Sequence, residues 1–297
     1  MADTSVYDLD ILDVDEPHGG EDRKDATVRP SERGPVTYLL RVIVVGYLFF
    51  LVVWPVSLVV RETFEDGFAN FVDTLSDPLV IDALQLTAVV AISAVVINTV
   101  FGIGISLILV RYEFPGKRVL NALIDLPLAV SPVVVGLSLV LVYNGRDGWF
   151  GPTLEDNGFQ VLFATPAIVM ATAFVALPLV IRELVPVLEE IGTEQEQAAH
   201  SLGAGPAQTF RRITLPAIRW ALVYGVVLSL ARSLGEFGAV KIVSGNVIGR
   251  TQTATLVVEE RYQEFQQDSS YAIAFLLAAV SVACIIVVSL LRPKDHS

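Results

Sequence analysis

Long runs of apolar residues without a single charge recur along the chain and define its organisation. Runs of this kind cover residues 42–60, 83–110, 126–143, 158–181 and 269–291. A helix needs about 20 predominantly apolar residues to cross the hydrocarbon core of a bilayer, whereas the strands of a membrane barrel are shorter and alternate strictly. The pattern therefore predicts five membrane-spanning helices and argues against a barrel.

A sixth apolar segment, residues 215–240, is interrupted by Arg219, Arg232 and Glu236. Its uncharged middle, residues 220–231, is too short to span alone, so this helix must carry charge partly into the membrane. We therefore expect an all-α membrane protein whose transmembrane domain covers residues 37–292. The six predicted spans are residues 38–60, 83–110, 120–143, 158–182, 215–240 and 269–291.

The composition agrees with this architecture and narrows the chemistry. Apolar residues make up 53% of the 297 residues and charged residues only 18%, against about 25% charged in soluble domains. Cys284 is the single cysteine, and the three histidines, His18, His200 and His296, lie outside the apolar segments. A disulfide framework is therefore excluded, and we expect no metal site and no histidine-built catalytic centre.

The first 36 residues differ from the rest of the chain. They hold ten acidic and four basic residues, are rich in Asp, Gly and Pro, and lack apolar periodicity. Such a composition is typical of disorder, so residues 1–36 are predicted to form a disordered acidic tail. A cleaved signal peptide is not expected, because the first apolar stretch begins only near residue 38 and is long.

The distribution of Lys and Arg beside the spans predicts the orientation. With the N-terminus in the cytoplasm, fourteen basic residues fall in inner segments and only four in outer loops. Because inner segments carry the excess of basic residues, we expect a multi-pass protein of the cell membrane with both termini cytoplasmic. The longest inner segment, which contains residues 193–216, then lies between the fourth and fifth spans.

This inner loop combines a short helical pattern with two conformational signals. Ala198, Ala199 and Leu202 have the spacing of one helical face. Gly203 suits the position just after a helix, where left-handed dihedrals are needed, and Pro216 suits the first turn of the next helix. These features alone fit an ordinary surface helix and turn as well as a docking site.

The same loop resembles the cytoplasmic "EAA" loop of binding-protein-dependent ABC importer permeases. That motif reads Glu-Ala-Ala, three residues, Gly, nine residues, then Ile, any residue, Leu and Pro. Six residues match it in identity and spacing: Ala198, Ala199, Gly203, Ile213, Leu215 and Pro216. Gln197 stands at the motif's glutamate, with Glu196 just before it. The resemblance implies that these eight residues form a coupling loop that docks on an ATP-binding cassette subunit.

Other stretches are similar to oxyanion importers. Residues 125–132, 182–186, 218–222 and 232–238 look like sulfate and molybdate permeases, and residues 243–251 resemble the W-type member of the sulfate/thiosulfate permease pair. The resemblance implies a subunit that translocates sulfate or thiosulfate by alternating access and binds no cofactor itself, since ATP and magnesium belong to the cassette subunit. A molybdate or tungstate permease is the nearest alternative.

The resemblance also implies the partners of the chain. They are a dimer of cassette subunits, a second sulfate permease, an extracytoplasmic sulfate-binding protein and membrane lipid, with no role for nucleic acid. An intramembrane hydrolase is disfavoured because neither HExxH nor GxSxG occurs, and the nearest phosphate-loop pattern, at Gly245 and Gly249, lacks the lysine. A simple membrane anchor would not need six spans.

The charges of the fifth span allow two interpretations. Arg232 and Glu236 are four residues apart, so a local ion pair would lower the cost of placing either charge in the membrane, and we favour this structural role. In the alternative, Arg232 and Glu236 line the anion route or its outer gate together with three hydroxyl groups, those of Ser131, Ser138 and Ser233.

Asp125 at the start of the third span is predicted to make a contact at the helix end or with a partner rather than to bind substrate. Prolines inside the spans remove backbone hydrogen bonds and are expected to kink or break the helices. They are Pro127, Pro132, Pro166 and Pro178.

Overall fold

The computed structural model describes residues 35–291 of the chain, so nearly all of the acidic tail predicted over residues 1–36 lies outside the described residues. The described residues divide into two units, one that ends at Trp54 and one that begins at Pro55. In the first unit, α1 (Pro35–Leu48) continues into a short π-helical segment, η1 (Phe49–Val53). Residues Thr37–Glu65 together form a 29-residue apolar helical segment, long enough to cross a membrane.

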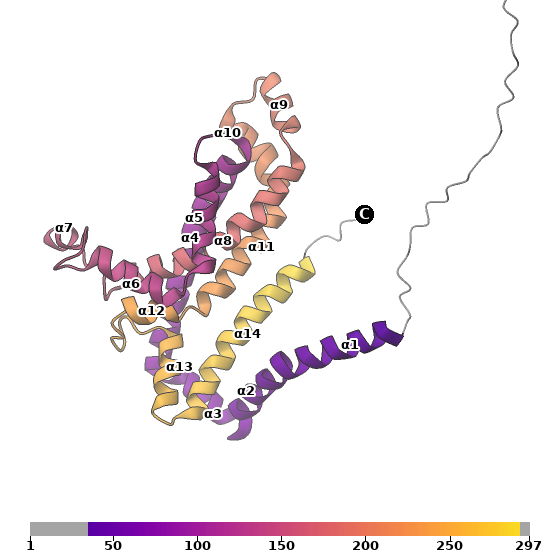
Figure 1. The fold of residues 1–297 in the computed structure, drawn as a ribbon. Coiled ribbons are helices and arrows are strands. Elements are labelled where there is room, and N and C mark those ends of the chain that lie inside the picture. Colours follow the sequence, from indigo (N-terminus) through magenta and orange to yellow (C-terminus); the bar gives the residue numbers. More distant parts are fainter. Residues whose placement is uncertain (1–34, 292–297) are drawn as a thin grey trace, which may run out of the picture. The chain divides into compact units, whose positions relative to one another are not determined.

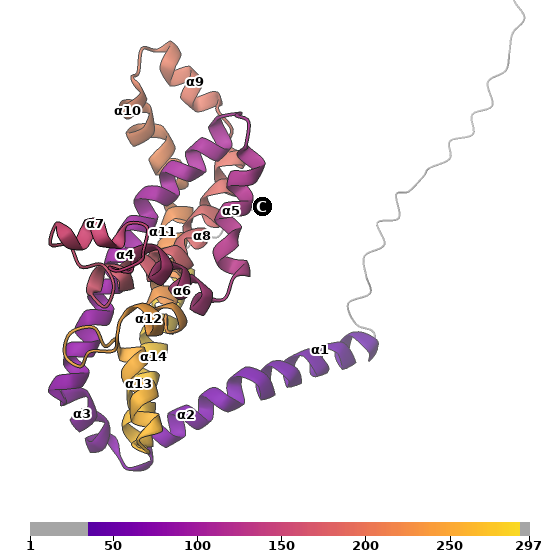
Figure 2. The ribbon, with the colours of Figure 1, turned by 60° about the vertical axis from the view of Figure 1, so that its left-hand side comes forward.

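The described part of the second unit consists of helices joined by turns and loops, with no strand. Its elements are α2 (Trp54–Glu65), α3 (Phe68–Ser76), α4 (Pro78–Arg111), α5 (Lys117–Ala129), α6 (Pro132–Tyr143), α7 (Gly151–Asp156), α8 (Thr165–Ile191), α9 (Glu194–Ser201), α10 (Pro206–Thr209), η2 (Phe210–Thr214), α11 (Leu215–Leu234), α12 (Gly238–Val243), α13 (Ala254–Gln263) and α14 (Gln267–Leu291). The α9–α10 hairpin lies at one end of this unit and α3 and α13 lie at the other (Figures 1 and 2).

The centre of the second unit is the packing of α4, α8 and α11. Small residues allow the close approach that is typical of membrane helices. A Cβ atom built on Gly102 of α4 would lie 2.7 Å from Cγ1 of Val180 in α8, and one built on Gly225 of α11 would lie 3.1 Å from Cα of the same valine. Val180 therefore sits between the two neighbouring helices and is fully buried.

Among residues 35–291, five helical segments are long and apolar enough to span a membrane, and the pair α5 and α6 brings the number to six if it counts as one span. The third span, predicted as one helix over residues 120–143, is instead bent by 112° between Ala129 and Pro132. Proline disfavours the helical conformation of the residue before it, and Ser131 is extended, with φ −60° and ψ 136°. The expected break is therefore present, at Pro132 rather than at Pro127.

The fourth and fifth spans also differ from the predicted bounds. The fourth helix, α8, begins at Thr165 rather than at residue 158 and continues to Ile191, because Gly158 and Phe163 have positive φ and interrupt the segment before it. The fifth helix ends at Leu234, and α12 starts separately at Gly238. The predicted span over residues 215–240 is thus two helices.

The loop predicted over residues 193–216 is largely helical. After α9 and a short turn, one continuous helix runs from Pro206 to Leu234. Pro216 lies in the first turn of α11, as predicted, but α10 and η2 continue directly into that helix. The π-helical segment η2 directly precedes Pro216, and Leu215 N–H donates to the carbonyl of Phe210, five residues back. Such a bulge re-registers the backbone hydrogen bonds where proline lacks a donor.

Candidate functional site

Helices α9 and α10, residues 194–209, form a hairpin that is called the α9 hairpin below. The backbone at the end of α9 has a fixed conformation. Gly203 has a φ of +85°, which confirms the left-handed conformation expected from the sequence. Its N–H donates to the carbonyl of His200 at 2.9 Å, and the N–H of Ala204 donates to the carbonyl of Ala199 at 3.0 Å. These two bonds form a Schellman motif, which satisfies the last carbonyls of α9 and fixes the direction in which the chain leaves the helix.

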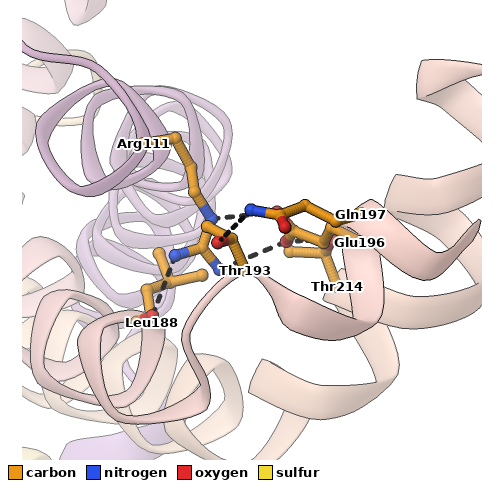
Figure 3. A network of polar contacts seen from close by, with 6 residues as sticks. All are labelled: Arg111, Leu188, Thr193, Glu196, Gln197 and Thr214. Atoms are coloured by element: carbon orange, nitrogen blue, oxygen red, sulfur yellow. Dashed lines mark hydrogen bonds and ion pairs between the residues drawn. The ribbon is translucent and has the colours of Figure 1, made fainter. Parts of the chain in front are cut away.

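An ion pair connects α9 to the end of α4 (Figure 3). Arg111 Nε donates to Glu196 Oε2 at 3.0 Å and Nη2 donates to Oε1 at 3.2 Å, while Nη1 donates to the carbonyl of Leu188 at 3.0 Å. Thr214 Oγ1 donates to Glu196 Oε1 at 2.8 Å. The side chains of Arg111 and Glu196 are only 12% and 20% exposed. The Glu196 carboxylate thus joins α4, α9 and η2, and Arg111 joins α8 to them through the carbonyl of Leu188.

Gln197, which stands at the motif's glutamate position, does not take part in this ion pair. Its Nε2 donates at 2.9 Å to Oγ1 of Thr193, the residue directly before α9, and its side chain is exposed. Glu196 therefore supplies the carboxylate contact one position earlier. Arg111 and Thr214 were not predicted as members of the site. The only sequence signal for Arg111 was a basic residue directly after an apolar run.

The remaining loop residues divide between two faces. Ala199 is buried, whereas Ala198 is exposed and Leu202 is 89% exposed, so the three do not share the one face predicted for them. Ile213 and Leu215 are half-buried and Pro216 is exposed. The exposed Leu202 at the tip of the hairpin leaves an apolar side chain and small neighbours open to another surface.

The opposite end of α11 contains the expected ion pair between Arg232 and Glu236, with Nη1 and Oε2 2.8 Å apart. Glu236 lies beyond the end of α11, in the break before α12, and its side chain is only 2% exposed. Its Oε1 accepts the N–H of Ala239 at 3.0 Å, and its carbonyl accepts Thr255 Oγ1 at 2.9 Å. Glu236 therefore caps α12 in addition to neutralising Arg232.

The three hydroxyl groups considered with Arg232 are not gathered around it. Ser131, directly before α6, and Ser138 on α6 are exposed, and Ser138 Oγ donates to the carbonyl of Val134 in its own helix at 2.9 Å. Ser233 is buried, and its hydroxyl has no hydrogen-bond partner among the described residues. Within residues 35–291, no hydrogen bond joins any of the three serines to Arg232.

Asp125 makes an interhelical contact that its sequence position did not predict. It lies inside α5 rather than at the start of a span, and its Oδ1 accepts Nε of Arg182 in α8 at 2.8 Å. Asp125 Oδ2 also contacts Arg182 Nη2. Both residues belong to stretches that resemble oxyanion permeases, but no local pattern links two residues 57 positions apart, so the sequence does not predict the pairing.

Comparison with known proteins agrees with the geometry. Residues 98–294 match the family described as binding-protein-dependent transport system inner membrane component. The sulfate transport system permease protein CysW of Synechococcus elongatus is 45% identical over 248 residues, which is 84% of this chain and 86% of that protein. CysW of Escherichia coli K12 is 41% identical over 243 residues, 82% of this chain and 83% of that protein.

Solved structures share the fold at much lower sequence similarity. A bacterial ABC transporter involved in the import of the acidic polysaccharide alginate has a chain that superposes with a TM-score of 0.73 and 16% identity, covering 88% of this chain and 96% of that chain. From these matches, the chain belongs to the family of binding-protein-dependent transport system inner membrane components, and it is a membrane subunit of a transporter rather than an enzyme.

Proposed function

We propose that this chain is a permease subunit of an ABC importer that translocates sulfate, driven by ATP hydrolysis on a separate cassette subunit. The proposal that the substrate is sulfate rests on the sequence identity of 45% and 41% to two sulfate permeases over more than four-fifths of the chain. Thiosulfate is an expected second substrate, since it is also a tetrahedral dianion. Molybdate or tungstate is the competing class.

The α9 hairpin supports the coupling part of the proposal. A helix that transmits motion must be fixed to the membrane helices on one side and free to dock on the other. The Arg111–Glu196 pair and the Thr214 contact supply the fixed side, and the exposed Ala198 and Leu202 supply the free side. In this proposal the cassette subunit binds that face, and closure of two cassettes around ATP and magnesium moves the hairpin.

The broken helices support alternating access. The breaks after Ala129 and after Leu234 lie close together in space, since a Cβ atom built on Gly238 would lie 3.1 Å from Cβ of Pro132. Short helices that follow such breaks can shift as units while the long helices stay packed. We infer that α6 and α12 belong to the outer gate, with Arg232, Glu236 and Ser233 at its base.

The orientation proposed for the chain follows from the basic residues at the end of the second unit that carries α9 and α10. The exposed Arg211 and Arg212 lie in η2 beside the α9 hairpin, and Lys117 and Arg118 begin α5. The basic-inside preference then assigns this end to the cytoplasm, with both chain termini on the same side. A second permease, an extracytoplasmic sulfate-binding protein and lipid complete the proposed assembly.

The acidic outer segments favour delivery by a binding protein over capture from solution. Counting from Arg61, thirteen acidic residues face four arginines in the predicted outer segments. Such a surface repels free dianions over about a Debye length. The high-affinity anion site is therefore assigned to the binding protein rather than to this chain.

Uptake of radiolabelled sulfate by cells with and without the gene tests the proposal. Loss of high-affinity sulfate uptake, growth that depends on cysteine, and unchanged molybdoenzyme activity are expected. In proteoliposomes, transport by the purified permeases and cassette should need a sulfate-loaded binding protein. Normal sulfate growth with lost molybdoenzyme activity would instead assign the chain to the molybdate class.

A further inference from the structure

The ion pair between Asp125 and Arg182 is only partly enclosed by this chain. Arg182 Nε donates to Asp125 Oδ1 at 2.8 Å and Nη2 contacts Oδ2. Nevertheless, 42% of the arginine side chain and 45% of the aspartate side chain are exposed. Beside the pair, Ile124 and Ile181 are buried in an apolar cluster with Leu109. The pair therefore lies at the outer edge of the cluster and faces away from the unit's own core.

The packing of α8 against α11 places this pair between the two ends of the membrane-spanning helices. A Cβ atom built on Gly225 would lie 3.1 Å from Cα of Val180 and 3.3 Å from Cβ of Glu183, so Arg182 is level with Gly225. Gly225 lies at the centre of the uncharged stretch of α11. Arg219 and Arg232 bound that stretch six and seven residues away, about 9 Å and about 10 Å along the helix.

A half-exposed ion pair at this depth cannot face lipid without a large cost, because charged groups in the hydrocarbon region need water or protein around them. In the assembled transporter it must therefore face a water-filled route or a protein surface. Arg182 Nη1 has no hydrogen-bond acceptor among the described residues, and a water-filled route would supply one. A water-filled route fits the pair better.

The donors that remain around the pair suit an oxyanion. Asp125 takes the Nε and Nη2 donors of Arg182, and no described residue accepts a hydrogen bond from Nη1. A guanidinium binds tetrahedral oxyanions with the same fork that it uses for carboxylates. The Asp125 carboxylate thus occupies the place of two anion oxygens.

The break between α5 and α6 adds a second group of donors nearby. The last residue of α5, Ala129, is four residues from Asp125, about 6 Å along the helix. Beyond it, Ser131 precedes α6, is exposed and makes no side-chain capping bond. In transporters, the N-terminal ends of broken helices at mid-membrane are directed at anionic substrate groups.

We propose that Arg182 is the mid-membrane contact of the translocated oxyanion and that Asp125 is its positioning residue. The carboxylate holds the guanidinium in place when the route is empty and competes with the anion when it is occupied. Binding stays weak for this reason, which lets the anion leave towards the cytoplasm. The inference rests on the proposed function, since it assumes that an oxyanion passes this surface.

Transport kinetics in proteoliposomes test the role of Arg182. The assembled transporter, with both permeases, the cassette and the binding protein, is assayed for uptake of radiolabelled sulfate and for ATP hydrolysis. Arg182→Gln should lower uptake at least about tenfold while ATP hydrolysis stimulated by the loaded binding protein stays within about twofold of the wild type. Arg182→Lys should retain part of the uptake, because lysine keeps the positive charge but lacks the two parallel hydrogen-bond donors of the guanidinium group.

A charge exchange separates anion contact from a purely structural pair. The double variant Asp125→Arg with Arg182→Asp re-forms the attraction but moves the cation to α5. Assembly judged by gel filtration should recover, and uptake should stay lost. Recovery of uptake to near the wild-type value would overturn the proposal.

Cysteine labelling tests whether the surface borders water without relying on activity. In a Cys284→Ser background, Leu128→Cys lies three residues from Asp125 on the same face of α5, and Leu126→Cys lies on another face; both leucines are exposed. The assembled transporter should react with a small charged thiol reagent at position 128 and not at position 126, and sulfate should slow the reaction. Absence of labelling at 128 would show a lipid or protein contact and overturn the proposal.

A wild type that transports molybdate but not sulfate would overturn the proposed substrate alone, and the variants would then be assayed with that anion.

Discussion

Arg111, the last residue of α4, holds Glu196 of α9 through two parallel hydrogen bonds, Nε to Oε2 at 3.0 Å and Nη2 to Oε1 at 3.2 Å. The same guanidinium also donates to the carbonyl of Leu188 near the end of α8. One side chain thus connects a membrane helix, its neighbour and the exposed hairpin. The first prediction follows from this connection.

Glu196→Gln should uncouple the hairpin from the membrane helices. Loss of a hydrogen-bonded charge at a mostly buried site costs about 1.5–3 kcal/mol of folding free energy, so we expect α9 to open more easily. ATP hydrolysis should then no longer respond to the binding protein. Hydrogen exchange of α9 measures the local effect. Glu113→Gln is the matched control, since Glu113 pairs with Lys117 on the same side but is 88% exposed. Equal effects of the two variants would contradict the prediction.

Gly203→Val should disrupt the end of α9. The φ of +85° is unfavourable for a residue with a Cβ by about 1–2 kcal/mol, and valine is β-branched. We expect the variant to reach the membrane while sulfate uptake falls steeply, as measured by immunoblot and labelled uptake. Gly203→Asn should be milder because asparagine tolerates this conformation, and Gly104→Ala should be neutral, since a Cβ there meets nothing within 4 Å.

Leu202→Asp should abolish cassette binding without affecting the membrane domain. Leu202 is 89% exposed at the hairpin tip, so the substitution breaks no internal contact but places a charge in an apolar docking surface. Co-purification of the cassette subunit is the measurement. Phe265→Asp changes an equally exposed apolar residue, 87% exposed, at the turn between α13 and α14, and should leave co-purification unchanged. Normal cassette binding by the Leu202 variant would show that the hairpin only connects α8 to α11 and does not dock on the cassette subunit.

Exchanging the charges of Arg232 and Glu236 should not restore the protein. Arg232→Glu alone is expected to damage folding, and the added Glu236→Arg re-forms the ion pair. However, Glu236 Oε1 also accepts the N–H of Ala239, and arginine has no acceptor. The double variant should therefore remain less stable in a thermal unfolding assay. Glu236→Gln, which loses the charge but keeps an acceptor, should be destabilised less than the double variant. Full recovery of the double variant would show that the ion pair is the only role of Glu236.

Thiol labelling of intact cells tests the orientation. In a Cys284→Ser background, a cysteine at the exposed Asn157, just after α7, should react with a membrane-impermeant reagent from outside. A cysteine at the exposed Gln208 in α10 should react only after the membrane is permeabilised. The reversed pattern would overturn the orientation and the assignment of the hairpin to the cytoplasm.

The sequence by itself determined the features that depend on local composition. Apolar runs without charge predicted where the membrane helices lie, because the bilayer selects for length and apolarity of each segment separately. Gly203 and Pro132 were informative for the same reason: the conformation that each permits or imposes is a property of one or two residues.

Tertiary structure decided which polar groups meet. Glu196 rather than Gln197 contacts Arg111, 85 residues earlier in the chain, and Asp125 contacts Arg182, 57 residues later. Such pairings depend on how α4, α5 and α8 pack, and no local pattern specifies which of several basic and acidic residues come together. The bend of 112° between α5 and α6 is of the same kind, since proline predicts an interruption but the helices that pack on either side set its angle.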